Sequence, residues 1–484
     1  MLKSIINLNK KKISINSVLL INLTLAFFPI SFIVGNLFIN LNLVLFCILG
    51  IFHLKSKLLT AKYNLPIKII FLFFLAILFS TSLSFIKFLY FEDYESIHLG
   101  RLIKAILFFR FFLMLIIIYF LNEFKILNLK YFFISAAFSA FVVSLDVIYQ
   151  YTFGFNIIGL ESLGHHNSSF FGDEWIAGGF IQNFSFFSIL FVTHILKNKK
   201  YLRFIFTTIT TCIVATGILL SLNKMPLVLF FIGLLLAFLF DNKLRKIIPI
   251  SLLCIFVLFK LMLESDVLLK GKYLTLQNSF KVTIGTLDLE NDSGEASKSQ
   301  KSSEVKKEYS EKIKFLNDKT WHGQLLLTAL DTWQPNKIFG NGIKSFRFDC
   351  YELQRKYRGD LLDESVISEY NFTEEYIKSK KNRLCSTHPH NYYFEILTET
   401  GIVGLTITLI IAALFLVFIL KNFNFLRGNN IENFILLAAT ISLFLEVFPF
   451  KSSGSLFTTN DAAYIILISS IIISHKKKTS TNSE

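Results

Sequence analysis

Residues 102–121 read LIKAILFFRFFLMLIIIYFL, an apolar run interrupted by only two charged side chains, Lys104 and Arg110. A run of this length crosses about 30 Å of hydrocarbon as an α-helix. The bilayer core offers no water to exposed backbone groups, so only helices and closed barrels span it. The apolar residues are continuous rather than alternating, which favours a helix over a barrel strand.

Similar runs recur along the 484-residue chain, which has a mean hydropathy of +0.56 and 56 phenylalanines. The predicted spans lie near 16–33, 37–53, 67–86, 102–121, 131–152, 176–196, 202–221, 225–241, 246–263, 395–420, 430–448 and 460–475. The sequence therefore predicts an all-α polytopic membrane protein with about twelve transmembrane helices. Only Gly35 and Asn36 separate the first two spans, so one long bent helix is an alternative there.

The distribution of basic residues predicts the orientation of these spans. If the N-terminus is cytoplasmic, the lysine-rich connections fall on the cytoplasmic side and the short outside loops hold few basic residues. Those outside residues are Lys87, Arg101, Lys224 and Lys451. This asymmetry predicts that both termini are cytoplasmic and that one large loop lies on the opposite side.

The net charge of +15 would by itself suggest a nucleic-acid-binding protein. Here the basic residues flank membrane spans on one side, which disfavours that class of partner. The first apolar run is too long for a cleaved signal peptide, and no small-residue cleavage site follows it.

The large loop divides the chain into a membrane domain of about nine helices (1–263), a loop domain (264–394) and three further spans with a short tail (395–484). Within the loop, residues 291–314 are rich in Ser, Lys and Glu, which predicts disorder or a mobile helix. Apolar spacing between Trp321 and Trp333 predicts an amphipathic helix lying on the membrane or on the bundle.

Two of the five cysteines, Cys350 and Cys385, lie in the loop domain. An oxidising compartment permits a disulfide between them, which would connect the Arg347 region to the stretch after Cys385. Two free thiols are the alternative.

A second stretch, residues 386–405, reads STHPHNYYFEILTETGIVGL and carries the polar chemistry. Pro389 disfavours helix at His388, and Asn391 can cap the helix that follows. His390 precedes the first helical turn, where it can act as a general base toward a sugar hydroxyl or, when protonated, bind phosphate. For a single histidine, an interfacial anchor is the alternative.

The same stretch continues with a pair of carboxylates and a pair of glycines. Glu395 and Glu399 are four residues apart and share a helix face. Gly401 and Gly404 allow a neighbouring helix to approach closely.

These residues resemble the signature of the O-antigen ligase and polymerase superfamily, in which a His-Asn pair, an aromatic-Leu pair, a Glu and a Gly-x-x-Gly enter a membrane helix. The matching residues are His390, Asn391, Phe394, Leu397, Glu399, Gly401 and Gly404. IFGNGIKSFR at 338–347 is similar to the glycine-rich stretch upstream of the histidine in that family.

The resemblance implies a membrane glycosyltransferase with a GT-C-like fold that works without a metal, cofactor or nucleotide sugar. Such an enzyme moves a glycan from undecaprenyl pyrophosphate to an acceptor glycolipid, a growing glycan or a protein. It acts at the periplasmic face of the bacterial inner membrane. A ligase is the preferred interpretation, and a polymerase of the same superfamily is the alternative.

A leaving lipid pyrophosphate needs cations where negative charge grows, and arginine binds two phosphate oxygens at once. The candidates are Arg347, Lys344, Lys224, Arg383 and Arg110. Family members often carry an arginine near the position of Lys224, so this chain departs from the pattern there. Arg101 is a further candidate, or an interfacial side chain that snorkels.

The outside stretch at 159–180, GLESLGHHNSSFFGDEWIAGGF, is a candidate for contact with the glycan. The candidate glycan-binding residues are Asp173, Glu174, Tyr392 and Glu399. Adjacent histidines such as His165 and His166 rarely bind one ion, so no metal site is predicted. Asp146 and Gln150 are expected to face the bundle interior near this loop.

A twelve-span transporter or flippase is the rival from another class. It would show internal repeats and no large outside loop, whereas here the loop divides the spans nine to three. A non-catalytic envelope scaffold is the third alternative, and it would not need a histidine pair where a helix begins.

Overall fold

The computed structural model describes residues 17–55, 57–60, 62–91, 95–162, 164, 166–267, 269–271, 273–274, 321–357 and 383–475. Helices dominate these residues, and no β-strand occurs among them. The serine-rich segment 291–314 and His165 lie outside the described residues.

A helix occupies each predicted span. They are α2 (Ser17–Val34), α3 (Asn36–Leu54), α5 (Leu65–Phe91), α6 (Glu95–Glu123), α7 (Leu129–Phe153), α8 (Ala177–Ile195), α9 (Lys200–Leu220), α10 (Lys224–Phe240), α11 (Leu244–Ser265), α18 (Tyr392–Lys421), α20 (Ile431–Glu446) and α21 (Thr459–Ile473). In the described ranges, nine helices are long and apolar enough to cross a membrane. The helices α10, α20 and α21 are shorter, with 17, 16 and 15 residues. The chain is an all-α polytopic membrane protein.

The first two spans are separate helices rather than one bent helix. Gly35 has φ +118°, a backbone conformation that side-chain-bearing residues rarely adopt. At this residue the chain reverses, and α2 packs against α3. The glycine is therefore what allows a hairpin with a single-residue connection.

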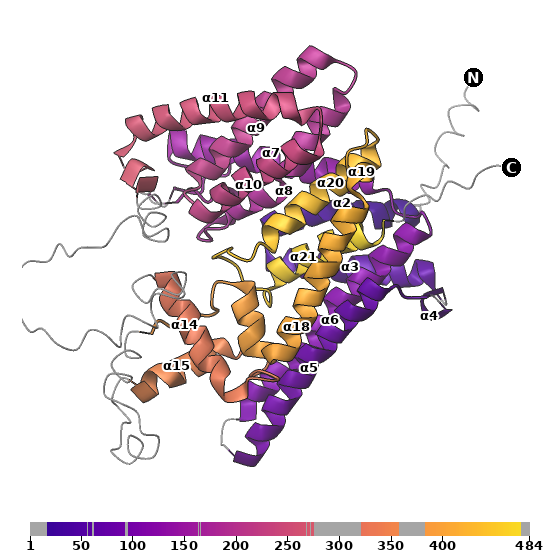
Figure 1. The fold of residues 1–484 in the computed structure, drawn as a ribbon, viewed down its shortest axis with the longest axis vertical. Helices are drawn as coiled ribbons and strands as arrows, with labels where there is room; N and C mark the ends of the chain where they lie inside the picture. Colours follow the sequence, from indigo (N-terminus) through magenta and orange to yellow (C-terminus); the bar gives the residue numbers. More distant parts are fainter. Residues whose placement is uncertain are drawn as a thin grey trace, which may run out of the picture.

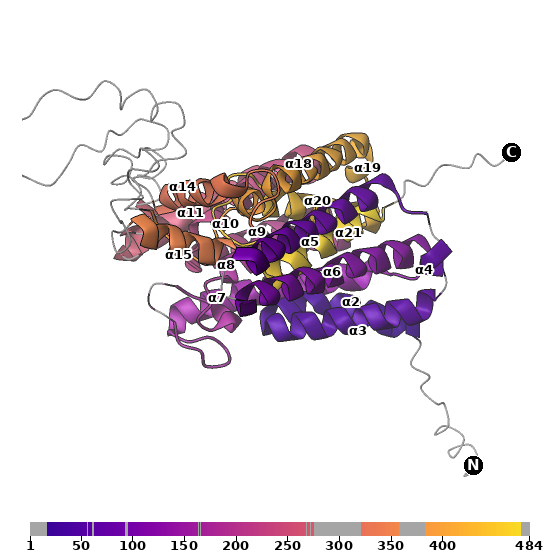
Figure 2. The same cartoon turned by 90° about the horizontal axis from the view of Figure 1, so that it is seen from below.

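The helices form one bundle with a continuous apolar core (Figure 1). Helix α7 packs against α8, α9 and α2, while α5 and α6 pack against α18 and α21. The short helices α14 (Trp321–Trp333), η3 (Gln334–Asn336) and α15 (Phe346–Tyr357) lie at one end of the bundle. The short helices α4 (Lys57–Thr60) and α19 (Phe423–Leu426) lie at the opposite end (Figure 2).

The amphipathic helix predicted between Trp321 and Trp333 is confirmed as α14, and it lies on the bundle against α18. A small second core, made by Ala329, Phe346 and Cys350, joins α14 to α15. Cys350 and Cys385 form a disulfide beside this core, with their Cα atoms 5.6 Å apart. The described part of the loop domain is thus attached to the bundle at one end.

The expectation that Asp146 and Gln150 face the interior is confirmed. Both side chains are buried, and they bind the loop that follows α7. The Asp146 carboxylate accepts a hydrogen bond from the Ile157 amide at 2.9 Å. The Gln150 amide oxygen accepts one from the Ser169 amide at 2.7 Å. These bonds fix the 155–169 loop beneath the start of α8.

Candidate functional site

Helix α18 begins with a side-chain cap, as the sequence predicts. The Asn391 amide oxygen accepts hydrogen bonds from the Tyr393 and Phe394 amides at 3.0 and 3.3 Å. Its amide nitrogen donates to the carbonyls of Pro449 and Lys451 at 2.8 and 3.2 Å. Asn391 therefore positions the helix and ties it to the turn before α21, with no donor atom left for a substrate.

The two histidines of this stretch lie against each other just before α18. Their ring centroids are 4.1 Å apart, and His390 has φ +57°, which turns the chain sharply into the helix. The His390 Nε2 atom lies 3.3 Å from the Ser386 hydroxyl, and the Trp321 ring lies 5.1 Å away. The first residue of α14, Trp321, therefore covers the histidine pair on one side.

Burial keeps both imidazoles neutral at physiological pH. It lowers the pKa of His390 to about 4, and the nearby His322 adds to the effect. Burial also lowers the pKa of His388 to about 3, with further repulsion from His390, Lys344 and Arg347. A neutral imidazole can accept a proton, which is the state that a general base requires.

The two motif stretches bind each other through their backbones. Within α18, Gly401 has φ +66° and ψ −166°, which kinks the helix. The segment Lys337–Gly342 fits into this kink, where the Gly342 amide donates to the Glu399 carbonyl at 2.8 Å. The Ile402 amide donates to the Lys337 carbonyl at 2.9 Å. The sequence predicts a neighbouring helix as the partner of Gly401; this is wrong, because the 337–342 loop backbone bonds the opened helix turn and lies closest to Gly401.

Below the histidines lies a buried cluster of carboxylates. Glu395 accepts from the Leu456 amide at 2.7 Å, and Glu399 accepts from the Lys344 amide at 2.6 Å. The Lys344 ammonium donates to the Ser455 hydroxyl at 3.3 Å. Burial lowers the pKa of Lys344, while the two glutamates raise it. Lys344 thus neutralises part of this cluster.

A second buried polar group joins α18 to α20. The Lys451 ammonium donates to the Glu446 Oε1 atom at 2.6 Å, and the Tyr392 hydroxyl donates to the same oxygen. Among the described residues, the Glu446 Oε2 atom is buried and has no hydrogen-bond partner. Buried ion pairs with an open acceptor are expensive unless something binds there.

A cavity of about 610 Å³ opens above these groups, within the usual range of about 300–1,000 Å³ for ligand sites. It is lined by His390 and Lys224, which the sequence predicted, and by many further polar and aromatic residues, among them the carboxylate Asp461. The others include His166, Trp175, Trp321, His322, Glu446 and Lys451. The cavity is named the central cavity below.

Helix N-termini converge on the central cavity. Its lining includes Gly179 in the first turn of α8, Lys224 at the first position of α10, and Asn460 at the start of α21. Backbone N–H groups and the helix dipole favour anions at such positions. With Lys224, they make this wall suited to a negatively charged group.

The other predicted cations lie elsewhere. Arg383 pairs with Asp331 at 3.0 Å, and Arg110 bonds Asn40 at 3.2 Å. Arg347 lies near His388, and its buried Nε atom has no partner within the described residues. Arg101 is buried rather than snorkelling, and it donates to the backbone carbonyls of Asn341 and Ile343.

The predicted glycan-binding residues do not form one group. Asp173 and Glu174 are exposed, whereas Tyr392 and Glu399 are buried below the cavity. Next to the acidic pair, Trp175 stacks on His166 with ring centroids 4.2 Å apart. That stacked pair, rather than Asp173 or Glu174, lines the cavity.

Several cavity residues are not predicted by the sequence. Glu446 is the last residue of α20, Lys451 lies in the connection between α20 and α21, and His322 lies in the first turn of α14. Lys451 had a signal, because it is a lone cation in a short outside loop. In the sequence, that signal indicates only the orientation of the membrane spans.

The comparison with known protein families decides the classification. Residues 209–409 match the family model described as O-antigen ligase. Over these residues the chain is similar to the O-antigen ligase family. No curated protein matches the chain. The matched range of the O-antigen ligase family contains Lys224, both motif stretches and the histidine pair, whereas Glu446 and Lys451 lie beyond it.

The apolar helices make the chain a multi-pass membrane protein, and the match to the O-antigen ligase family supports an enzyme of the glycosyltransferase type. The match also implies lipid-linked glycan substrates. The rival interpretation as a transporter loses its support.

The lowered pKa of His390 predicts the pH dependence of glycan transfer. An ordinary histidine, with a pKa of about 6.5, would lose its basic form as the pH falls through that value. His390, with its pKa lowered to about 4, stays neutral there, so kcat/KM should remain level from pH 8 to pH 5 and fall only below that. A pH profile with its midpoint near 6.5 would contradict this assignment.

Proposed function

We propose that this protein transfers a glycan from a polyprenyl pyrophosphate, undecaprenyl pyrophosphate in bacteria, to the hydroxyl of an acceptor glycolipid. The observation that supports this proposal most strongly is that His390 and Lys224 line one cavity. They come from segments far apart in the sequence, and they supply a base and a cation. Glycosyl transfer from a pyrophosphate requires both functions.

In this mechanism the neutral His390 imidazole takes the proton from the acceptor hydroxyl. The acceptor oxygen then attacks the anomeric carbon from the face opposite the pyrophosphate, so the configuration at that carbon inverts. The bond between the anomeric carbon and the pyrophosphate oxygen breaks, and both electrons leave with that oxygen. Lys224 and the helix N-termini of α8, α10 and α21 stabilise the charge that grows there.

Two further cations belong to the proposal in supporting roles. Arg347 and Lys344 lie close enough to His388 to lower its pKa by repulsion. We assign Arg347, which lies outside the cavity lining, to holding positive charge beside His388, and Lys344 to the neutralisation of Glu395 and Glu399.

Replacing Lys224 by glutamine should weaken binding of the donor more than it affects acceptor binding. A hydrogen bond to a charged group contributes about 1.5–3 kcal/mol, so the donor KM should rise about 10–100-fold. Steady-state kinetics with purified protein and a lipid-linked donor would measure it. Lys200→Gln, at the start of α9 and outside the cavity lining, is the matched control. Equal donor KM values for the two variants would show that Lys224 does not bind the donor.

The proposed topology has twelve spans, a GT-C-like arrangement and three domains at 1–263, 264–394 and 395–484. Both termini would be cytoplasmic in the bacterial inner membrane, with the loop domain in the periplasm. The separation of α14 and α15 from α4 and α19 along the bundle supports this orientation (Figure 2). Protease access to intact spheroplasts tests it, because cleavage within 264–394 is expected only from outside.

The transfer is proposed to need no metal. Within the described residues, no three His, Cys, Asp or Glu side chains gather as metal ligands. Transfer by purified protein in excess EDTA, compared with transfer after Mg²⁺ is restored, tests the proposal. A rate that depends on the added metal would refute it.

The acceptor class is tested by the glycolipids of a deletion strain. If the protein is a ligase, the strain accumulates lipid-linked polymer that is not joined to its acceptor. If it is a polymerase, the strain instead shows acceptors that each carry a single repeat unit. An unchanged glycolipid pattern would contradict both forms of the proposal.

A further inference from the structure

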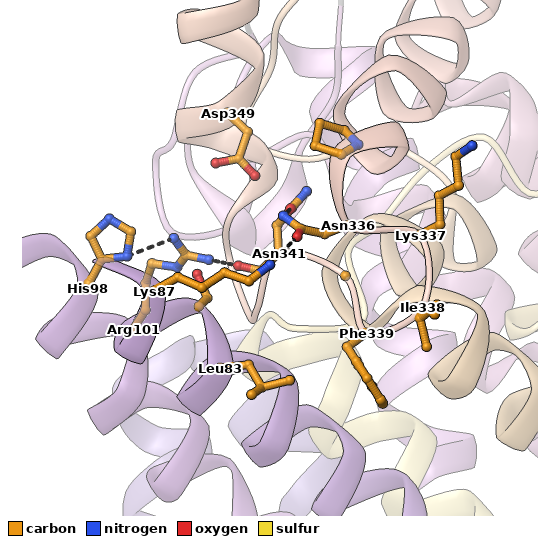
Figure 3. Close-up of a pocket in the computed structure, with 13 residues that line it drawn as sticks. Leu83, Lys87, His98, Arg101, Asn336, Lys337, Ile338, Phe339, Asn341 and Asp349 are labelled. Atoms are coloured by element: carbon orange, nitrogen blue, oxygen red, sulfur yellow. Dashed lines mark hydrogen bonds between the residues drawn. The ribbon is translucent and has the colours of Figure 1, made fainter. Parts of the chain in front are cut away.

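A second cavity is lined by residues of the 337–342 segment, and its lining shares no residue with that of the central cavity. It has a volume of about 510 Å³, large enough for a sugar headgroup. Its walls come from α5, α6, η3 and α15 (Figure 3). We name it the interface pocket.

The interface pocket lies where two membrane spans end. The spans predicted from the sequence run over 67–86 and 102–121, so Lys87 and His98 lie just beyond their ends, although helix α5 continues to Phe91. Both residues line the pocket. The opposite wall presents the exposed side chains of Ile338 and Phe339, and the Phe339 ring packs against Phe79 at 5.1 Å. The pocket therefore lies at the depth of lipid headgroups, with an apolar side for lipid chains.

Cations line one side of the pocket. Lys87 donates to the Asn336 amide oxygen at 2.6 Å, and an ammonium carries two further donors. Arg101 lies beside it, with His98 3.5 Å from its guanidinium (Figure 3). Helices α5 and α6, which carry Lys87 and Arg101, do not line the central cavity. The proposed transfer therefore does not explain these two cations.

A carboxylate faces these cations. Asp349 projects from α15 toward Arg101 and His98 (Figure 3). Its Oδ2 atom is buried and has no hydrogen-bond partner in the described ranges. Burial and the nearby Glu352 raise the pKa of Asp349 to about 7, while Arg101 and the Ser345 side chain lower it. A buried acceptor without a partner is costly, so its orientation into a pocket points to a ligand with a hydrogen-bond donor.

We propose that the interface pocket binds the phosphorylated sugar headgroup of the acceptor glycolipid. Lys87 binds the phosphate, Asp349 accepts a hydrogen bond from a sugar hydroxyl, and the lipid chains follow Ile338 and Phe339 into the membrane. That the bound glycolipid is the acceptor rests on the proposed function. The binding chemistry depends only on the pocket.

The interface pocket is joined to the catalytic helix through one turn. Arg101 donates to the carbonyls of Asn341 and Ile343, while the Asn341 amide donates to the Thr398 carbonyl of α18 at 3.0 Å. A headgroup in the pocket would therefore contact the same loop that holds the kink of α18. An acceptor in the interface pocket would therefore lie beside α18 and leave the central cavity free for the donor.

Binding is tested by titrating the purified full-length protein with four probes. These are a phosphorylated glycolipid, its dephosphorylated form, phosphatidylethanolamine and inorganic phosphate. The phosphorylated glycolipid should bind at least ~10-fold more tightly than the other three, because it alone presents a phosphate to Lys87 and sugar hydroxyls to Asp349. Equal affinity for phosphatidylethanolamine or inorganic phosphate would overturn the sugar-phosphate assignment.

Two variants locate the binding. Lys87→Gln should weaken the phosphorylated glycolipid ~10-fold, and Lys104→Gln, an exposed lysine of α6 outside the pocket, should not. Asp349→Asn keeps the shape and should weaken the glycolipid while leaving inorganic phosphate unchanged. Unaltered glycolipid binding in both Lys87→Gln and Asp349→Asn would refute the pocket.

Kinetics separate this inference from the proposed function. In a transferring enzyme, Lys87→Gln should raise the acceptor KM with the donor KM unchanged. If the wild-type protein binds the phosphorylated glycolipid through Lys87 but transfers nothing, the proposed function fails and the pocket stands. If transfer proceeds and Lys87→Gln leaves the acceptor KM unchanged, the pocket fails and the proposed function stands.

Discussion

Replacing His390 by alanine is expected to lower the rate of glycan transfer about 10²–10⁴-fold, the usual contribution of a general base. The residue lines the central cavity, and burial keeps its imidazole neutral and able to accept a proton. The substitution removes a half-buried side chain from a loop, so the bundle should still insert and fold. Transfer kinetics with purified variant, at saturating donor and acceptor, measure the loss.

His53→Ala is the matched control for that experiment. His53 lies in the last turn of α3 and does not line the central cavity. Its variant should transfer at the wild-type rate. If His390→Ala inserts normally and transfers at the wild-type rate, His390 is not the general base. The Oε2 atom of Glu446, which has no hydrogen-bond partner among the described residues, would then be the next candidate.

Replacing Gly401 by alanine is expected to destabilise the protein by about 2–5 kcal/mol. The left-handed conformation costs an L-residue about 1–2 kcal/mol, and overpacking adds about 1–3 kcal/mol. A Cβ at this position would lie 2.2 Å from the Ile338 carbonyl oxygen, and its φ is +66°. The loop would have to leave the kink of α18, which breaks the backbone bonds between the two motif stretches.

The thermal midpoint of the purified protein in detergent measures this effect. Gly100→Ala is the control, because Gly100 lies in α6 with an open space around its Cα and no left-handed φ. That variant should unfold at the wild-type temperature. If Gly401→Ala also unfolded at the wild-type temperature, the Ile338 carbonyl could not lie close to Gly401 in the folded protein.

The membrane architecture was readable from the sequence because hydropathy and charge act locally. Each span is predicted from a continuous apolar run, and a helix covers each one, although α5 and α6 extend beyond their predicted spans by up to five and seven residues. The Asn391 cap and the amphipathic α14 were predicted for the same reason. Capping and amphipathic spacing are properties of neighbouring residues, so no knowledge of the tertiary structure is needed.

The site was only partly predictable because it is built from distant segments. His390 and Lys224 were identified one at a time from local chemistry, but nothing in the sequence shows that they share a cavity. His322 has no distinguishing neighbours in the sequence, and the lone cation Lys451 indicates orientation without indicating a site. Arg101 was ambiguous, since a buried arginine that clamps a turn and one that snorkels occupy the same position in a span.

The partner of Gly401 shows the same limit. A Gly-x-x-Gly pattern indicates close approach of some backbone, yet it does not identify which one. Here that backbone is the other motif stretch, which joins the two parts of the family signature in space.

The central claim is that the cavity between His390 and Lys224 transfers a glycan from a lipid pyrophosphate. The most direct measurement supplies purified protein in proteoliposomes with a polyprenyl-pyrophosphate-linked glycan and an acceptor glycolipid, and follows both products. The account predicts one free polyprenyl pyrophosphate released for each glycan joined to the acceptor, and neither product with His390→Ala. Release of polyprenyl pyrophosphate without any glycosylated acceptor, or equal transfer by His390→Ala, would contradict it.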